Sequence, residues 1–248
     1  MNTLAQEIIN NKIPCVFVSP HFDDAFLSCG SLIADISGKT NITIINVFTK
    51  AHDDGLTLSA KKALSDAKYS NGIALYQARK KEDAEVYAHY KVTIVNLGLY
   101  EALFRRKKEV HWLGKLIPEF AHIYPTYRWH MHGQVHPHDP ARTVIYPAIR
   151  PYLINKPFLF IPYGIGNHVD HTLTRLVCEK EYERTVYYAD VPYTMRNNFY
   201  GKAIKGKKVY RYNTRMDVKT KMLQLYKTQF EGLFPGGIVP DHQEVYYR

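Results

Sequence analysis

The sequence predicts an α/β protein with one Rossmann-like domain, built on a mostly parallel sheet with helices on both faces. Short apolar runs alternate with longer segments of helical spacing, which is typical of βαβ units. The chain has 248 residues, 46% of them apolar and 23% charged, enough for one sizeable core. No Pro/Gly-rich linker or repeat divides it, so we expect residues 1–248 to form a single domain.

The expected elements follow one another as strand and helix in turn. The strands are short and apolar, and they cover residues 13–19, 41–48, 92–97, 157–162 and 185–188. The helices are expected over residues 24–36, about 71–89 and 168–182. The polar stretches 50–72 and 100–150 interrupt the alternation, so we expect long insertions at the rim of the sheet. The ending EGLFPGGIVPDHQEVYYR is expected to be a tail that packs over the sheet or on a partner subunit.

Charge and cysteine content limit the class of protein. The net charge is +10, and basic runs such as ARKKED, FRRKKE and KAIKGKKVYR allow an anionic partner. None of these runs lies in a recognisable nucleic-acid module, so we interpret them as solvated faces and expect no nucleic-acid partner. No segment approaches the roughly 20 apolar residues of a membrane span, and the start does not resemble a signal peptide. Three scattered cysteines indicate neither a disulfide framework nor a thiolate zinc site, and a cytoplasmic location is expected.

A polar motif follows the first expected strand. Residues 17–30 read FVSPHFDDAFLSCG, with His21, Asp23 and Asp24 on the turn. An imidazole and two carboxylates are unfavourable beside a buried strand unless they have partners. On its own, the motif also fits a turn in which an aspartate caps the next helix.

A second polar motif follows the fourth expected strand. In YGIGNHVDHTLTR, Asn167 is a candidate helix cap, and His168 and His171 lie at i and i+3 on one helical face. Alone, this pattern also fits an exposed helix start. Because the carboxyl ends of parallel strands share one edge, the two motifs are expected to converge there. Imidazoles with one carboxylate and no thiolate are typical of a catalytic zinc site, and a spare aspartate can act as the base.

The motifs resemble those of a known family. SPHFDDAFLSCG is similar to AHPDDExLGCGG, and GIGNHVDHTLT to the later HPDH motif, of the metal-dependent N-deacetylases called PIG-L or LmbE-like. Arg79 and Glu82 match an RxxE pair, and NLGLYEA matches an LGxxD-like segment. YYADVPY and LYKTQF resemble segments nearer the family's end.

The resemblance implies a role for each matched residue. It makes His21, Asp24 and His171 ligands of Zn²⁺ or of another divalent transition metal, and Asp23 the general base. It makes His168 the group that stabilises the tetrahedral oxyanion or an acid that assists departure of the amine. In this reaction type a zinc-activated water attacks an acetamide carbonyl and yields acetate and an amine. The implied substrate is a small N-acetylated sugar or glycoconjugate, with Arg79 in contact with it.

The sequence departs from the family pattern at three places. Phe22 replaces proline and offers an aromatic wall to the substrate. Ala25 replaces a glutamate, which we expect to change only the groups that support the site. Glu101 replaces an aspartate, so a substrate contact is expected there with a side chain one methylene longer.

The insertion YPTYRWHMHGQVHPHDPAR also carries candidate ligands. A second metal site is one interpretation of four histidines and an aspartate, His130, His132, His136, His138 and Asp139. No apolar strand precedes them, so we expect a rim loop instead, in which Trp129, with Tyr127 and Arg128, contacts a sugar.

Two other functions compete with N-deacetylation of a sugar. One is hydrolysis of another amide or sugar conjugate, and the other is a metal-binding, non-catalytic carbohydrate-binding protein of the same fold. Asp23 favours an enzyme, because a structural metal does not need a spare carboxylate. The oligomeric state, including a homo-oligomer, is left open by the sequence.

Overall fold

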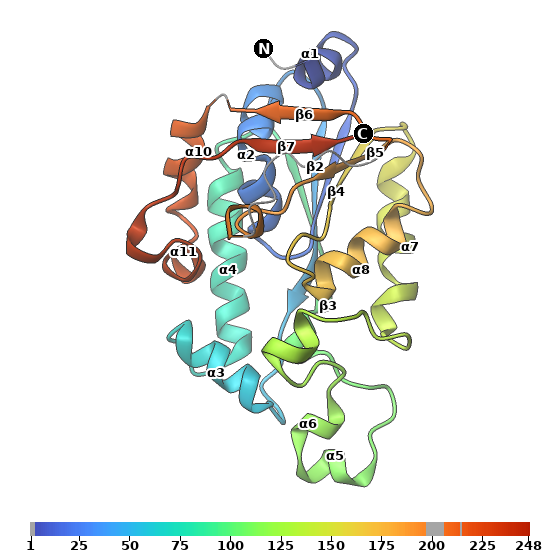
Figure 1. Cartoon of the computed structure of the whole chain (residues 1–248), viewed down its shortest axis with the longest axis vertical. Helices are drawn as coiled ribbons and strands as arrows, with labels where there is room; N and C mark the ends of the chain where they lie inside the picture. The colour runs from blue at the N-terminus through green and yellow to red at the C-terminus, as the bar shows by residue number, and fades with distance from the viewer. Residues whose placement is uncertain (1–2, 197–205, 214) are drawn as a thin grey trace.

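A computed structural model describes residues 3–196, 206–213 and 215–248 (Figure 1). Residues 202–205 of the basic run KAIKGKKVYR lie outside these ranges. The described residues form a seven-stranded sheet in the order β3-β2-β1-β4-β5-β7-β6. The strands are β1 (Cys15–Ser19), β2 (Ile42–Lys50), β3 (Thr93–Tyr100), β4 (Phe158–Pro162), β5 (Thr185–Tyr188), β6 (Val209–Tyr212) and β7 (Glu244–Tyr247).

The first five strands are parallel, and β1 is their topological centre. β1 pairs with β2 on one side and with β4 on the other, with Phe17 opposite both Ile44 and Phe160. After β1 the chain continues to β2 on one side of the sheet, and after β4 it continues to β5 on the other side. The direction in which successive strands are added therefore reverses between β1 and β4. In open α/β sheets such a switch point opens a crevice at the carboxyl ends of the strands. The two polar motifs therefore leave the sheet beside one another.

The alternation of side chains along β1 divides the core into two layers. Cys15 and Phe17 face one cluster, and Val16 and Val18 face the other. The first layer contains α1 (Thr3–Asn10), α2 (Asp24–Ile36), α4 (Gly72–Tyr87), α10 (Met216–Leu223) and α11 (Lys227–Leu233). The second contains α7 (Ile145–Ile149) and α8 (Val169–Cys178), and Figure 1 shows these two groups on opposite sides of the sheet. The predicted fold class, mostly parallel with helices on both faces, is confirmed.

Both insertions contain short helices that the sequence did not indicate. Residues 50–72 hold α3 (Leu58–Asp66), which begins where the Thr57 side chain accepts a hydrogen bond from the Ala60 amide. Residues 100–150 hold α5 (Trp112–Leu116), α6 (Pro118–Ala121), α7 and the turns η1 (Ala102–Phe104), η2 (Tyr127–Met131) and η3 (Pro140–Thr143), and η4 (Arg150–Leu153) begins at the last residue of this range. Apolar residues of both insertions form a third cluster with Phe22 and Val169, beside the two motifs. The insertions thus surround the carboxyl ends of the strands.

The last part of the chain differs from the expected tail. Residues 244–247 form β7, which pairs antiparallel with β5 and with β6 inside the sheet. The Glu244 carboxylate accepts hydrogen bonds from the Ser31 and Leu32 amides of α2 and from the Lys219 ammonium. The expected tail also contains η5 (Pro235–Gly237), whereas α9 (Tyr193–Arg196) lies earlier in the chain, after β5. The expectation of a tail lying over the sheet is therefore wrong for these four residues, whose buried side chains complete the sheet.

No helix among the described residues has the length and apolar character needed to cross a membrane.

Candidate metal and catalytic site

Two turns carry the site, one after β1 and one after β4. Ser19, the last residue of β1, accepts a hydrogen bond from the Ala25 amide and so fixes the first turn of α2. After β4 the chain turns through Gly164 and Gly166, whose φ angles are 84° and 87°. A Cβ on Gly166 would lie 2.4 Å from the Tyr193 ring, so this turn requires glycine. Asn167, the predicted cap, adopts a left-handed conformation, and His168 is the N-cap of α8 instead.

The structure brings His21, Asp24 and His171 together, with one potential ligand atom of each within 4.8 Å of the others. Asp24 Oδ2 lies 3.0 Å from His21 Nδ1 and 3.3 Å from His171 Nε2. Burial raises the pKa of Asp24, but the two imidazoles outweigh it and hold that pKa well below its usual range. Burial alone would lower the pKa of His171. The effect of Asp24 and Asp190 is larger, and the pKa of His171 is raised to about 10. The surrounding carboxylates therefore favour a positive charge at the point where the three side chains meet.

Two further carboxylates orient the imidazoles. His171 Nδ1 lies 2.7 Å from Asp190 Oδ1, while Asp190 Oδ2 accepts hydrogen bonds from the Gly164 and Ile165 amides. His21 Nε2 lies 3.1 Å from Asp170 Oδ2. A proton on each of these nitrogens leaves a lone pair on His171 Nε2 and on His21 Nδ1, the two atoms beside Asp24. This carboxylate–histidine arrangement is typical of metal ligands, so the donor set fits a divalent metal.

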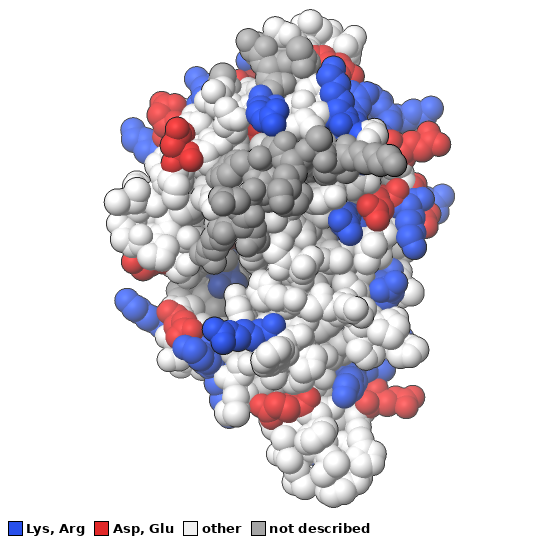
Figure 2. All heavy atoms as spheres, in the orientation of Figure 1, with Lys and Arg blue, Asp and Glu red and all other residues white. Residues whose placement is uncertain are grey.

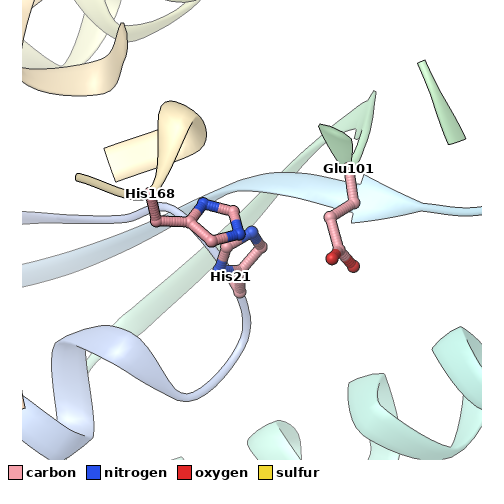
Figure 3. A group of neighbouring side chains, drawn as sticks. All are labelled: His21, Glu101 and His168. Atoms are coloured by element: carbon pink, nitrogen blue, oxygen red, sulfur yellow. The ribbon is translucent and has the colours of Figure 1, made fainter. Parts of the chain in front are cut away.

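His168 lies beside this group but has a different proton arrangement. Its Nδ1 accepts a hydrogen bond from the Asp170 amide at 3.2 Å, so the neutral ring carries its proton on Nε2. Burial and the neighbouring imidazoles lower the pKa of His168 well below 6.5, which keeps the ring neutral. His21, His168 and Glu101 also bring potential ligand atoms within 4.8 Å of one another (Figure 3). An N–H cannot ligate a metal, so this second group suits hydrogen bonding to a substrate better than metal binding.

Asp23 is buried and is not a helix cap. It occupies the N-cap position of α2, yet its side chain makes no capping hydrogen bond. Burial and the adjacent Asp24 raise the pKa of its carboxyl group to about 6, against the effects of Arg79 and His21. The capping alternative therefore does not explain this residue. A carboxyl group with a pKa near neutrality, beside a candidate metal site and without a ligand's contacts, has the properties of a general base.

Arg79 and Glu101 line the same side of the site. Arg79 Nη1 lies 3.8 Å from Glu101 Oε2, and its guanidinium lies 5.3 Å from the centre of the Tyr76 ring. Within the described part of the chain, Arg79 Nε and the Tyr76 hydroxyl are buried without a hydrogen-bond partner. Burial raises the pKa of Glu101 to about 7. Glu82, the other member of the RxxE pair, instead accepts hydrogen bonds from the amide and hydroxyl of Thr228, in the LYKTQF segment.

A buried network that the sequence did not reveal supports Asp170. Arg105 forms ion pairs with Asp170 and with Asp139, and its guanidinium lies 4.4 Å from the centre of the Phe48 ring. Burial raises the pKa of Asp170, but Arg105 and His21 outweigh it and lower it well below the usual range. Arg105 belongs to the FRRKKE run that we interpreted as a solvated face, and the residue is 3% exposed. No sequence signal separated it from its exposed neighbours.

The remaining predicted residues lie farther from this centre. Phe22 is 1% exposed and packs 6.3 Å from the Tyr76 ring, so it supports the turn from inside and offers no open wall. Trp129 is 82% exposed at the surface. Among the described residues, 130–139 contribute no group of metal-ligating atoms; Asp139 binds Arg105. His132 alone approaches the site, with its ring 5.3 Å from that of His168.

The comparison with known families agrees with this geometry. The family described as "PIG-L: GlcNAc-PI de-N-acetylase" matches residues 16–180, which contain both motifs. The chain belongs to the PIG-L family. It is accordingly a hydrolase of the N-deacetylase type, as the motifs implied.

Several known proteins similar to this PIG-L chain are deacetylases. A 2'-N-acetylparomamine deacetylase from Niallia circulans is 24% identical over 250 residues, covering 90% of this chain and 83% of that protein. A deacetylase of teicoplanin biosynthesis, solved as a "deacetylase-bog complex", has a TM-score of 0.71 at 18% identity and covers 94% of this chain and 96% of its own. The "zinc inhibited form of teicoplanin deacetylase Orf2" also has a TM-score of 0.71, at 19% identity, with 94% and 97% covered. These structures share the fold.

Proposed function

We propose that this PIG-L chain removes the acetyl group from the amide nitrogen of an N-acetylated sugar or glycoconjugate. The observation that carries the proposal is Asp23, a buried carboxyl group with a pKa near 6 beside three residues arranged as metal ligands. A metal that only stabilises the fold needs no such group. The deacetylation of 2'-N-acetylparomamine by the related protein supports the substrate class.

The metal is proposed to be Zn²⁺, held by His21, Asp24 and His171. Two imidazoles and one carboxylate are typical ligands of catalytic zinc, and they leave a coordination position for water or substrate. Zinc bound there would supply a Lewis acid and lower the pKa of a coordinated water toward ~7. The orientation of His171 by Asp190 and of His21 by Asp170 favours this ligand set over the group that contains His168.

Asp23 and His168 would then provide the proton transfer and the hydrogen bonding that amide hydrolysis also needs. Asp23 accepts the proton from the attacking water and passes it to the departing amine. His168 donates its Nε2 proton in a hydrogen bond to the oxygen that becomes negative during the attack. Of the two roles implied for His168, the neutral ring favours stabilisation of the oxyanion over acid catalysis, because a ring with a strongly lowered pKa holds no extra proton at neutral pH.

Arg79, Glu101 and the Tyr76 hydroxyl are proposed to bind the sugar. Arg79 Nε and the Tyr76 hydroxyl are buried and have no hydrogen-bond partner in the described chain. Sugar hydroxyls can satisfy both groups, which would otherwise be unfavourable to bury. Trp129 remains a predicted contact for a larger glycoconjugate only, because it lies at the open surface.

The test combines metal analysis with acetate release. We expect about one zinc per chain and release of acetate from at least one member of a panel of N-acetylated amino sugars. The panel should also contain N-acetylated amines without a sugar ring and N-acyl sugars with longer chains. Activity on the plain amines alone would favour a hydrolase of another amide, and sugar binding without acetate release in zinc-loaded protein would favour the binding protein.

A further inference from the structure

The insertions place a group of apolar side chains on the surface. Eight large apolar side chains of the described residues are at least half exposed, and six of them lie in residues 58–129. We call these six the apolar surface: Leu58, Trp112, Leu116, Phe120, Tyr127 and Trp129. The other two, Ile154 and Ile238, belong to other parts of the chain. Grouping of this kind marks an interaction site more often than single exposed residues do.

Hydrogen bonds join the three segments that carry the apolar surface. The Leu58 amide donates to Glu119 in α6, and the Tyr127 amide donates to the Ser59 hydroxyl in α3. α5 and α6 pack closely, since a Cβ on Gly114 would lie 2.5 Å from Val110 and 3.1 Å from the Ala121 amide. Figure 1 shows α5 and α6 as a projection at the bottom of the molecule, and the end of that projection is free of charged side chains on the face seen in Figure 2.

The apolar surface reaches the catalytic site. The Tyr127 ring lies 5.2 Å from the His132 ring, which in turn lies 5.3 Å from the His168 ring. A partner bound to the apolar surface would therefore lie two ring contacts away from His168.

Basic side chains accompany the apolar ones. Residues 106–128 contribute five exposed cations, Arg106, Lys107, Lys108, Lys115 and Arg128. The acidic residues in this range are Glu109 and Glu119, and Glu119 already accepts the Leu58 amide. Exposed tryptophan and leucine with lysine and arginine around them are typical of proteins that insert side chains into the interface of an anionic membrane.

We propose that the apolar surface docks this protein on an anionic lipid bilayer, with the catalytic site facing the membrane surface. A second copy of the chain is a poorer occupant, because a symmetric contact would bring the same five cations toward one another. A nucleic acid is also a poorer occupant, since it offers no apolar environment for Leu58 and Leu116. The proposal is independent of the substrate and of the metal.

Vesicle binding tests the proposal, and the chain contains a natural reporter. Trp112 and Trp129 are its two tryptophans, and both lie on the apolar surface. With vesicles containing about one third phosphatidylglycerol, we expect co-sedimentation and a blue shift of tryptophan emission, at least ~10-fold stronger than with phosphatidylcholine alone. High salt should weaken the binding. No binding to the anionic vesicles, or equal binding to both kinds, overturns the proposal.

A pair of matched variants locates the contact. Leu116→Asp with Phe120→Asp should reduce anionic-vesicle binding by ~10-fold or more, because aspartates are repelled and do not enter the interface. Ile154→Asp with Ile238→Asp changes two apolar residues elsewhere that are at least as exposed, and this variant should bind as the wild type does. Equal loss of vesicle binding in both double variants overturns the proposal. It is also overturned if the wild type does not bind vesicles but self-associates, and if the first double variant abolishes that self-association. Unchanged melting temperatures show that both variants fold, and acetate release from a soluble N-acetyl sugar tests the proposed function separately.

Discussion

Asp23 and Asp24 are neighbours in the chain, yet the site moves the pKa values of their carboxyl groups in opposite directions. Asp24 contacts two imidazoles and has a strongly lowered pKa, while Asp23 contacts neither ring and has a pKa raised to about 6. Carboxyl groups whose environments push their pKa values apart commonly divide the work of a catalytic site. The pair therefore allows proton transfer and metal binding to be tested separately.

Replacement of Asp23 by asparagine should separate proton transfer from metal binding. Asp23→Asn keeps the shape of the side chain but cannot accept a proton at neutral pH, so we expect full metal content with kcat lowered by ~10² to 10⁴. Asp24→Asn should lose metal and activity together, because a neutral oxygen is a poorer ligand for a dication. Metal analysis and acetate release on the same preparations check both expectations. Full turnover in Asp23→Asn would show that another group is the base.

The Asp190 carboxylate is expected to strengthen the metal site without touching the metal. Asp190→Asn weakens the hydrogen bond that orients His171 and reduces the basicity of its Nε2, so metal affinity should fall by ~10- to 100-fold. Titration with a competing chelator measures this loss. Asp66→Asn, a change at an exposed helical aspartate, is the control and should leave the affinity unchanged. Wild-type affinity in Asp190→Asn would mean that packing alone fixes the His171 ring.

The sequence predicted which residues meet, but only part of the groups that support them. The placement of each motif after a strand predicted that the two motifs converge, and the resemblance to the PIG-L motifs singled out His21, Asp24 and His171 as ligands. Asp190 lay in the recognised YYADVPY segment, yet nothing in that segment shows that its carboxylate faces an imidazole. Arg105 was hidden for a physical reason, because one buried arginine in a basic run has the same local pattern as its exposed neighbours.

At the scale of elements, Arg105 joins the long insertion to α8, the helix that carries His171. Its guanidinium bridges Asp139 in the insertion and Asp170 in the first turn of α8, and Asp139 also accepts the Tyr124 hydroxyl. The insertion thus contributes to the position of His21 through Asp170.

Removal of this bridge should be strongly destabilising. Arg105→Met leaves two buried carboxylates without their cation, and the free energy of unfolding should fall by ~3 to 5 kcal/mol, the usual range for breaking a buried ion pair. Arg105→Lys keeps the charge but cannot bridge two carboxylates with a planar fork, so we expect a smaller loss. Urea denaturation of the metal-free proteins measures both. Equal stability of the wild type and Arg105→Met would show that the network carries no net free energy.

Prediction of the elements succeeded where the apolar pattern was unambiguous. The helix over residues 24–36 and the strand over residues 185–188 have the predicted limits. α3 was missed because its mean hydropathy is low and only Ala60 and Leu64 are buried. β7 was missed because it follows a Gly- and Pro-rich stretch and its burial depends on pairing with β5 and β6, which no local pattern reveals.

At the scale of the whole molecule, the net charge of +10 is not one uniform basic surface. Arg105 is buried in an ion pair with Asp170, and Lys219 is buried between Glu244 and His242. Composition alone could not separate such cations from those around the apolar surface, since burial is decided by tertiary contacts. Absence of a nucleic-acid partner stays a prediction, and salt-sensitive, weak binding of unrelated DNA is the expected outcome of its test.

The buried Lys219–His242 contact predicts how overall stability depends on pH. Lys219 donates to His242 Nε2 and His242 Nδ1 lies 2.9 Å from the Pro240 carbonyl, so the folded ring is neutral. Burial and the Lys219 charge lower the pKa of His242 from 6.5 to about 3. Between these values the unfolded chain binds a proton that the folded chain does not. The contribution of His242 is therefore complete above pH 6.5 and is lost as the pH falls toward 3.

The variant His242→Gln isolates this contribution from those of other titrating groups. The amide oxygen of the introduced glutamine can accept a hydrogen bond from Lys219, and the amide group has no pKa in this range. The wild-type free energy of unfolding minus that of the variant should fall by up to ~1.4 kcal/mol for each pH unit below 6.5. Urea denaturation of the metal-free proteins at several pH values between 4 and 8 measures this difference. A difference independent of pH would show that His242 takes up a proton as readily in the folded chain as in the unfolded one, against the neutral ring inferred from its two contacts.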